Sequence, residues 1–174
     1  MTDTDATVFH KIPIRGETNM EERLKIGKKA RDFVLKDHRN EDFRLSDFEE
    51  KRVLLSFHPL AWTSICARQM KTLEENKSVF DSLDTLAVGL SVDTVPSKFA
   101  WANTLGITHT RLLSDFWPHG RVSNMYGLFR NDDGVSQRAN VLVDENRSIR
   151  FVKIYEPGEL PTIQDVIQFI EQMK

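Results

Sequence analysis

The sequence predicts a single α/β domain in which a central mixed β-sheet carries helices on both faces. Two apolar runs of strand length, residues 52–57 and 85–91, are each followed by a segment with helical features. Two more strands, joined by a short polar turn, and a final amphipathic helix come after them. Strands that alternate with helices in this way are typical of a sheet covered on both sides.

Length and composition fit one compact domain with a substantial core. The chain has 174 residues, of which 40% are hydrophobic and 29% are charged. Residues 1–23 are polar and aperiodic, so we expect an N-terminal extension there and the folded domain at residues 24–174. The formal net charge of -2 gives no reason to expect nucleic acid or an anionic membrane as a partner.

Membrane and export signals are not recognised in the sequence. No stretch approaches the roughly 18 to 20 apolar residues that cross a bilayer. The first residues carry acids where a secretory signal needs bases. A single cysteine excludes a disulfide framework within the chain and suits a reducing compartment, so we expect a cytoplasmic protein.

The first strand and helix place the cysteine. Residues 52–57 (RVLLSF) form a compact apolar run typical of a buried central strand, which ends at His58 and Pro59. Thr63 or Ser64 can then cap a helix whose apolar residues recur at near-helical spacing as far as Phe80. Cys66 is therefore expected in the first turn of a helix that follows a strand.

The second half of the chain supplies the remaining elements. Residues 85–91 form a second buried strand, and Pro96 begins a helix that Gly106 ends. We expect a short strand at 112–113, a short helix at 121–126, strands at 139–143 and 149–155, and a helix at 162–173. The polar link at 144–147 is suited to a hairpin turn. This is the element order of a thioredoxin-like fold.

A short motif surrounds the cysteine. Residues 58–70 read HPLAWTSICARQM and hold Pro59, Thr63 and Cys66 in the spacing PxxxTxxC. With later segments such as SVDTVPSKFAW and QRANVLVD, this motif resembles the peroxiredoxins, the family of the alkyl hydroperoxide reductases and thiol-specific antioxidant proteins. The resemblance implies a thioredoxin-like fold and a single-cysteine, thiol-dependent peroxidase acting on hydrogen peroxide or organic hydroperoxides.

Such a reaction requires a thiolate. An ordinary cysteine, with a pKa of about 8.5, is mostly protonated at neutral pH, whereas the thiolate is the nucleophile. A helix N-terminus stabilises a negative charge by about 0.3 to 1 kcal/mol. That is less than the roughly 1.36 kcal/mol equivalent to one pKa unit, so a nearby cation is also needed.

The resemblance to peroxiredoxins implies which residues complete the site. Arg138, just before a late strand, matches the active-site arginine of the family, and its guanidinium can hold both a thiolate and peroxide oxygens. The hydroxyl of Thr63 can orient the peroxide, although Thr63 could also be only a helix cap. Pro59 can shape the loop and shield the site from water.

Several further residues in or near the motif are candidates for the site. Peroxiredoxins commonly carry glutamate where this chain has Gln69, whose amide can still accept a hydrogen bond from Arg138. Arg68 is expected on a solvated face. His58 is a candidate for lining the pocket or titrating near neutrality, or for a satisfied residue at a strand end. The candidates for the pocket wall or a dimer surface are Trp62 and Trp117-Pro118, and packing alone explains them equally well.

Partners and cofactors follow from what the sequence offers. The histidines show no metal-ligand spacing and the glycines form no phosphate-binding cluster, so neither a metal nor a nucleotide cofactor is expected. With one cysteine, the oxidised enzyme needs an external thiol from a thioredoxin, a glutaredoxin or a small thiol. The resemblance implies a homodimer.

Two other functions remain open from the sequence. A thiol-disulfide oxidoreductase usually needs CxxC, and residues 63–66 (TSIC) lack the first cysteine. A peroxide-responsive redox sensor would oxidise Cys66 and pass the signal to a partner. Steady-state turnover with a plain thiol would favour the enzyme, whereas a stable mixed disulfide would favour the sensor.

Overall fold

The computed structural model of the chain describes residues 23–173. The N-terminal extension predicted at residues 1–23 therefore lies, apart from Arg23, outside the described residues. The strands are β1 (Val34–Asp37), β2 (Asp42–Arg44), β3 (Arg52–Phe57), β4 (Thr85–Ser91), β5 (Arg111–Ser114), β6 (Phe129–Arg130), β7 (Val135–Ser136), β8 (Arg138–Val143) and β9 (Ile149–Tyr155). The helices are α2 (Ser64–Glu75), α3 (Lys77–Ser82), α4 (Val95–Leu105), α5 (Arg121–Met125) and α6 (Ile163–Gln172), with a 3-10 turn at Leu45–Phe48.

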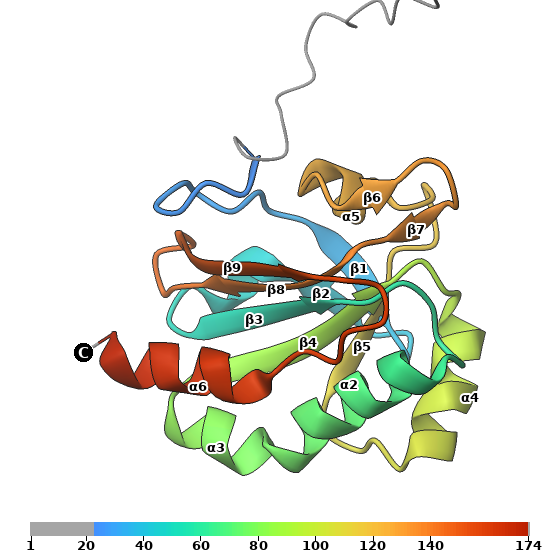
Figure 1. The fold of residues 1–174 in the computed structure, drawn as a ribbon, viewed down its shortest axis with the longest axis horizontal. Coiled ribbons are helices and arrows are strands. Elements are labelled where there is room, and N and C mark those ends of the chain that lie inside the picture. The colour runs from blue at the N-terminus through green and yellow to red at the C-terminus, as the bar shows by residue number, and fades with distance from the viewer. Residues whose placement is uncertain (1–22, 174) are drawn as a thin grey trace, which may run out of the picture.

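A seven-stranded mixed sheet forms the centre of the fold, in the order β2-β1-β5-β4-β3-β8-β9 (Figure 1). β3, β4 and β5 are parallel, whereas β8 runs antiparallel to β3 and β1 antiparallel to β5. β3 and β4 carry almost uninterrupted buried residues, as expected for strands covered on both faces. The predicted α/β class with a central mixed sheet is confirmed.

Two hydrophobic clusters fill the two faces of the sheet. One contains side chains from α2, α3, α4 and α6, including Cys66, Met70 and Trp101. The other contains Val122 and Tyr126 at α5, together with the segment that leads into β1. In Figure 1, α2, α3 and α6 lie below the sheet and α5 lies above it with the β6–β7 hairpin. The expected cover on both faces is present, with longer helices on the side of Cys66.

The helix expected as far as Phe80 is in fact two helices. α2 ends at Glu75, Asn76 adopts a nonhelical conformation, and α3 begins at Lys77. The amide side chain of Asn76 donates to the Thr72 carbonyl at 2.8 Å, which satisfies the end of α2 while the chain changes direction. Phe80 is buried and belongs to α3.

Two hairpins were not predicted from the sequence. β1 and β2 pair across a turn in which Asn40 has a φ of 64°, and β6 pairs with the two-residue strand β7. Strands of two to four residues are too short to show a periodic pattern. Within residues 23–173, no helix is long and apolar enough to cross a membrane.

Candidate active site

Cys66 lies where the sequence places it, in the first turn of α2 after the loop that leaves β3. The helix begins at Ser64, and the Ala67 amide donates to the Thr63 carbonyl at 2.9 Å. Cys66 is only 1% exposed and belongs to the cluster between α2 and the sheet. The sulfur therefore lies near amide groups that have no partner inside the helix.

Arg138 is brought to the thiol by the pairing of β8 with β3. It is the first residue of β8, which runs antiparallel to β3. Its Nη1 donates to Cys66 Sγ at 3.5 Å, and its Nη2 donates to the Pro157 carbonyl at 3.2 Å. Arg138 is 4% exposed, so water screens its charge little at the sulfur. The structure thus unites the two groups that the sequence assigned to one site.

Gln69 holds the arginine, as the sequence allowed. Its Oε1 accepts a hydrogen bond from Arg138 Nη1 at 2.5 Å. Its Nε2 donates to Ser56 Oγ at 2.8 Å and to the Phe57 carbonyl at 3.2 Å. Both ends of the amide are therefore used, and the neutral side chain fixes the position of the guanidinium.

A buried hydrogen-bond network extends from Gln69 across the sheet, and the sequence analysis missed it. Ser56 Oγ donates to Asn140 Oδ1 at 2.8 Å, and Asn140 Nδ2 donates to the Tyr155 hydroxyl at 3.4 Å. Ser56 and Asn140 face each other in the register of β3 with β8. Their signal was present, since each is a polar residue inside an otherwise apolar strand, and buried polar groups require partners.

Thr63 and Pro59 border the cavity over the thiol. The Thr63 hydroxyl donates to the Leu60 carbonyl at 3.0 Å. Thr63 is the N-cap residue of α2, as expected, but its side chain makes no capping hydrogen bond. Because its hydrogen is used, the hydroxyl oxygen can still accept a hydrogen bond from a ligand.

A cavity of about 470 Å³ opens over Cys66. Its wall combines apolar side chains with the charged groups of Arg138, Arg130 and Asp133. It is lined by Pro59, Leu60, Thr63, Ser64, Ile65, Cys66, Arg130, Asp133, Val135, Arg138 and Pro157. The thiol is therefore buried but borders a space large enough for a small peroxide.

His58 and Trp62 do not line this cavity. The ring of His58 is fully buried against Trp101, with ring centroids 5.5 Å apart. Burial and the charges of Lys98 and Arg138 hold its pKa well below the ordinary value, against an opposing contact at the Ser56 backbone. Titration near neutrality is therefore wrong for His58, and among the described residues its ring nitrogens find no well-aligned partner.

Trp62 lies on the outer side of the loop. It is 55% exposed, has a φ of 66°, and its indole NH donates to Ser97 Oγ at 3.0 Å. The expected role in the pocket wall is therefore wrong, whereas the exposure of this side chain suits a role at the surface. Arg68 is exposed, as predicted.

The other histidines within residues 23–173 have separate local partners. His38 Nδ1 accepts from the Leu112 amide at 3.2 Å, His109 contacts Glu74, and His119 contacts the Gly134 carbonyl. Within residues 23–173, no group of three potential metal ligands occurs.

Comparison with known proteins identifies the family. The AhpC/TSA family profile matches residues 26–152. Alkyl hydroperoxide reductase E of Mycobacterium tuberculosis (strain ATCC 25618 / H37Rv) is 39% identical over 138 residues, which cover 79% of this chain and 90% of that protein. Peroxiredoxin-1 of Gekko japonicus is 28% identical over 156 residues, covering 84% of this chain and 77% of the relative.

Solved structures agree with this assignment. The reduced 2-Cys peroxiredoxin of Plasmodium vivax is 27% identical and superposes with a TM-score of 0.76 over 84% of this chain and 80% of that one. The mitochondrial 2-Cys peroxiredoxin of Plasmodium falciparum, at 24% identity and a TM-score of 0.76, covers 85% of this chain and 93% of its own and shares the thioredoxin-like fold. The chain, with its single cysteine, therefore belongs to the AhpC/TSA family and is a thiol-dependent peroxidase of the peroxiredoxin kind.

Proposed function

We propose that Cys66 is the nucleophile of this peroxidase and that Arg138, Thr63 and Pro59 complete its site. The observation that carries this proposal is the contact of Arg138 Nη1 with Cys66 Sγ at 3.5 Å inside a buried site. A guanidinium at this distance favours the thiolate over the thiol. The same cation can stabilise the negative charge that develops on the departing peroxide oxygen.

The reaction is a displacement on oxygen. The Cys66 thiolate attacks the terminal oxygen of a hydroperoxide, the O–O bond breaks, and an S–O bond forms. The departing oxygen takes up a proton and leaves as water or an alcohol, while the sulfur becomes a sulfenic acid. Thr63 accepts a hydrogen bond from the peroxide and orients it, and Pro59, which lines the same cavity, shields the site from water.

Turnover requires two reducing equivalents from outside the chain. The sequence holds one cysteine, so no second thiol of the same chain can attack the sulfenic acid. An external thiol forms a mixed disulfide with Cys66 and releases water, and a second thiol restores the reduced enzyme. Thioredoxin, glutaredoxin and small thiols are the candidates. A reducing compartment supplies all three, and on that basis we place the protein in the cytoplasm.

Mixing the reduced protein with hydrogen peroxide or an organic hydroperoxide tests the proposal directly. We expect Cys66 to gain one oxygen atom, seen by intact mass, orders of magnitude faster than a free thiol. Intrinsic tryptophan fluorescence follows the same step. Cys66→Ser is the control and should gain no oxygen rapidly. Oxidation no faster than that of a free thiol would contradict the proposed site.

Thr63→Val should lower the rate of peroxide reduction about tenfold to a hundredfold, because it removes the oxygen that orients the substrate while keeping the shape of the side chain. Thr63→Ser is the matched variant and should retain most of the rate. Stopped-flow measurement of Cys66 oxidation gives both values. Equal rates for the valine and serine variants would show that the hydroxyl has no part in the reaction.

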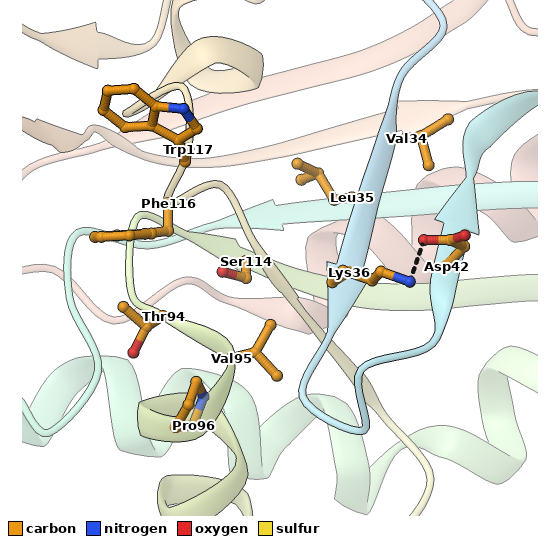
Figure 2. A pocket seen from close by; sticks show the side chains of 10 residues that line it. All are labelled: Val34, Leu35, Lys36, Asp42, Thr94, Val95, Pro96, Ser114, Phe116 and Trp117. Atoms are coloured by element: carbon orange, nitrogen blue, oxygen red, sulfur yellow. Dashed lines mark ion pairs between the residues drawn. The ribbon is translucent and has the colours of Figure 1, made fainter.

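We also propose that the protein forms a homodimer through the surface around Phe116 and Trp117. Trp117 is 79% exposed and Phe116 is 46% exposed, on the loop that follows β5. They border a groove of about 560 Å³ that β1 and the start of α4 complete (Figure 2). In the same figure, the ion pair of Lys36 with Asp42 lies at the far side of the groove. Exposed apolar surface of this kind marks an interaction site. We propose that a second copy of this chain binds there.

Trp117→Glu should convert the dimer into a monomer, because the new carboxylate would be buried without a partner in the interface. Sedimentation equilibrium measures the outcome. Val79→Glu places the same charge on the exposed face of α3, away from the groove, and should leave the dimer intact. A wild-type protein that is monomeric at micromolar concentration would refute the interface.

A further inference from the structure

Lys98 is a fully buried cation that does not line the cavity over Cys66 and has no role in the reaction proposed for Cys66. It lies on α4 and is 0% exposed. It shares the inward face of the helix with Trp101 and Ala102, at the spacing of one helical turn. Those two residues belong to the same hydrophobic cluster as Cys66. The ammonium is therefore enclosed in the layer between α4, α2 and the sheet.

Among the described residues, no carboxylate lies within ion-pair distance of the Lys98 ammonium. Its Nζ donates to Ser91 Oγ at 2.6 Å. A buried ammonium without a paired anion is costly, and burial lowers the pKa of Lys98 to about 8. Asp93, Cys66 and Asp115 act in the opposite direction and favour the charged form. Lys98 is thus still mostly charged at neutral pH.

A short chain of hydrogen bonds fixes the ammonium relative to the loop before Cys66. The Ser91 hydroxyl donates to Asp93 Oδ2 at 2.6 Å, and the same oxygen accepts from the Ala61 amide at 2.8 Å. Ala61 belongs to the loop between β3 and α2. The lysine is therefore tied to the segment that positions the thiol, on the side of the site away from the open cavity.

The positive charges of Arg138 and Lys98 both reach the buried groups at the end of β3. Both cations depress the pKa of His58, which is fully buried near the end of β3. Lys98 and Cys66 also influence each other electrostatically, and little water lies between them to screen this effect because both are buried. Arg138 borders the cavity, whereas Lys98 does not.

Taking Cys66 as the nucleophile proposed above, we propose that Lys98 is a positioning residue of the peroxidase, a second cation that stabilises the Cys66 thiolate from within the protein while Arg138 does so from the cavity. In its ionised form the thiolate adds to the negative charges of Asp93 and Asp115, which also favour the charged ammonium. Lys98 makes no contact with the peroxide. Its effect is on the fraction of Cys66 that is ionised before the substrate arrives.

Lys98→Met tests this proposal, because it keeps the length of the side chain and removes the charge. We expect the pH at which half of the Cys66 thiol is ionised to rise by about one unit. The pH dependence of alkylation by iodoacetamide measures this midpoint without any peroxide, so the result does not depend on peroxidase turnover. Lys71→Met is the matched control, since Lys71 is exposed on the helix of Cys66 and should leave the midpoint unchanged.

A second measurement needs no change at Lys98. If the thiolate stabilises the ammonium, removing it must lower the pH at which Lys98 titrates, because coupling between two sites is reciprocal. Nitrogen-15 NMR of labelled lysine should show this fall in Cys66→Ser relative to the reduced wild type. The other titratable groups that face Lys98, namely Asp93, Asp115, His58 and His38, are the same in both proteins.

The outcomes separate the possibilities. A raised alkylation midpoint in Lys98→Met, with a lowered Lys98 titration in Cys66→Ser, supports the second cation. Lys98→Met and Lys71→Met with the same midpoint as the wild type would overturn it. If Lys98→Met fails to fold, an unchanged Lys98 titration in Cys66→Ser would overturn it alone. Slow oxidation of the wild-type protein by peroxide, combined with the expected rise of the midpoint in Lys98→Met, would instead count against the proposed peroxidase site.

Discussion

Arg138→Met should lower the rate of Cys66 oxidation by peroxide about a hundredfold to a thousandfold, because it removes a preorganised donor aimed at the developing charge. The side chain contacts both the sulfur and Gln69 and is 4% exposed. The thiolate also loses a cation, so the loss should be greatest at low pH. Stopped-flow oxidation with hydrogen peroxide over a range of pH measures both effects.

Arg130→Met is the matched control for this loss. Arg130 lines the same cavity but pairs with Asp133 at 2.6 Å and is partly exposed. Its replacement removes an equal charge from the cavity rim without touching the sulfur, so the rate should change little. A similar loss in both variants would mean that the overall potential of the cavity, and not the Arg138 contact, drives the reaction.

Glu74→Gln should destabilise the protein by about 2 kcal/mol near neutral pH, a cost typical of weakened charge-assisted hydrogen bonds. The carboxylate of Glu74, on α2, accepts from the backbone amides of residues 108–110 at 2.7 to 3.3 Å and from the Thr110 hydroxyl at 2.7 Å. It therefore holds the segment that enters β5. Urea denaturation of the two proteins gives the difference in the free energy of unfolding.

The effect of Glu74 should depend on pH in a defined direction. Desolvation acts to raise the pKa of Glu74, but the hydrogen bonds from Thr108, Thr110 and His109 outweigh it, so the pKa is lowered from 4.5. Its stabilising contribution is thus complete above about pH 4.5 and is lost as the pH falls toward the lower folded-state pKa. The difference between wild type and Glu74→Gln should shrink over that range.

Glu75→Gln makes the same chemical change one residue away, at an exposed position. It should alter the stability by only a few tenths of a kcal/mol, as surface substitutions usually do. If Glu75→Gln cost as much as Glu74→Gln, a general charge effect on α2 would explain the result better than the cluster of hydrogen bonds.

The regular elements were predictable because each has a clear local signal. Strands β3, β4 and β9 match their expected ranges, and α4 begins beside Pro96 and ends at Gly106, which has a φ of 71°. Apolar runs set the strands, and special backbone residues set the ends of helices. The same local signals put Cys66 at a helix start.

The contacts around the site were less accessible to sequence reasoning. Gln69 was expected near Arg138, but the onward path through Ser56 and Asn140 depends on the register of β3 with β8, which no local pattern reveals. His58 was misjudged for a related reason, since its burial arises from α4 packing beneath the loop. The buried charge of Lys98 likewise follows from how α4 docks onto the sheet.

The pairing of β3 with β8 also determines when the enzyme becomes active during folding. Cys66 and Arg138 are separated by 72 residues in the chain, and so are joined only after the intervening strands and helices have found their places. A nascent or partly folded chain would carry a thiol of ordinary reactivity. Fast reaction with peroxide is therefore a readout of complete tertiary assembly, and its recovery during refolding should lag behind the return of helical structure.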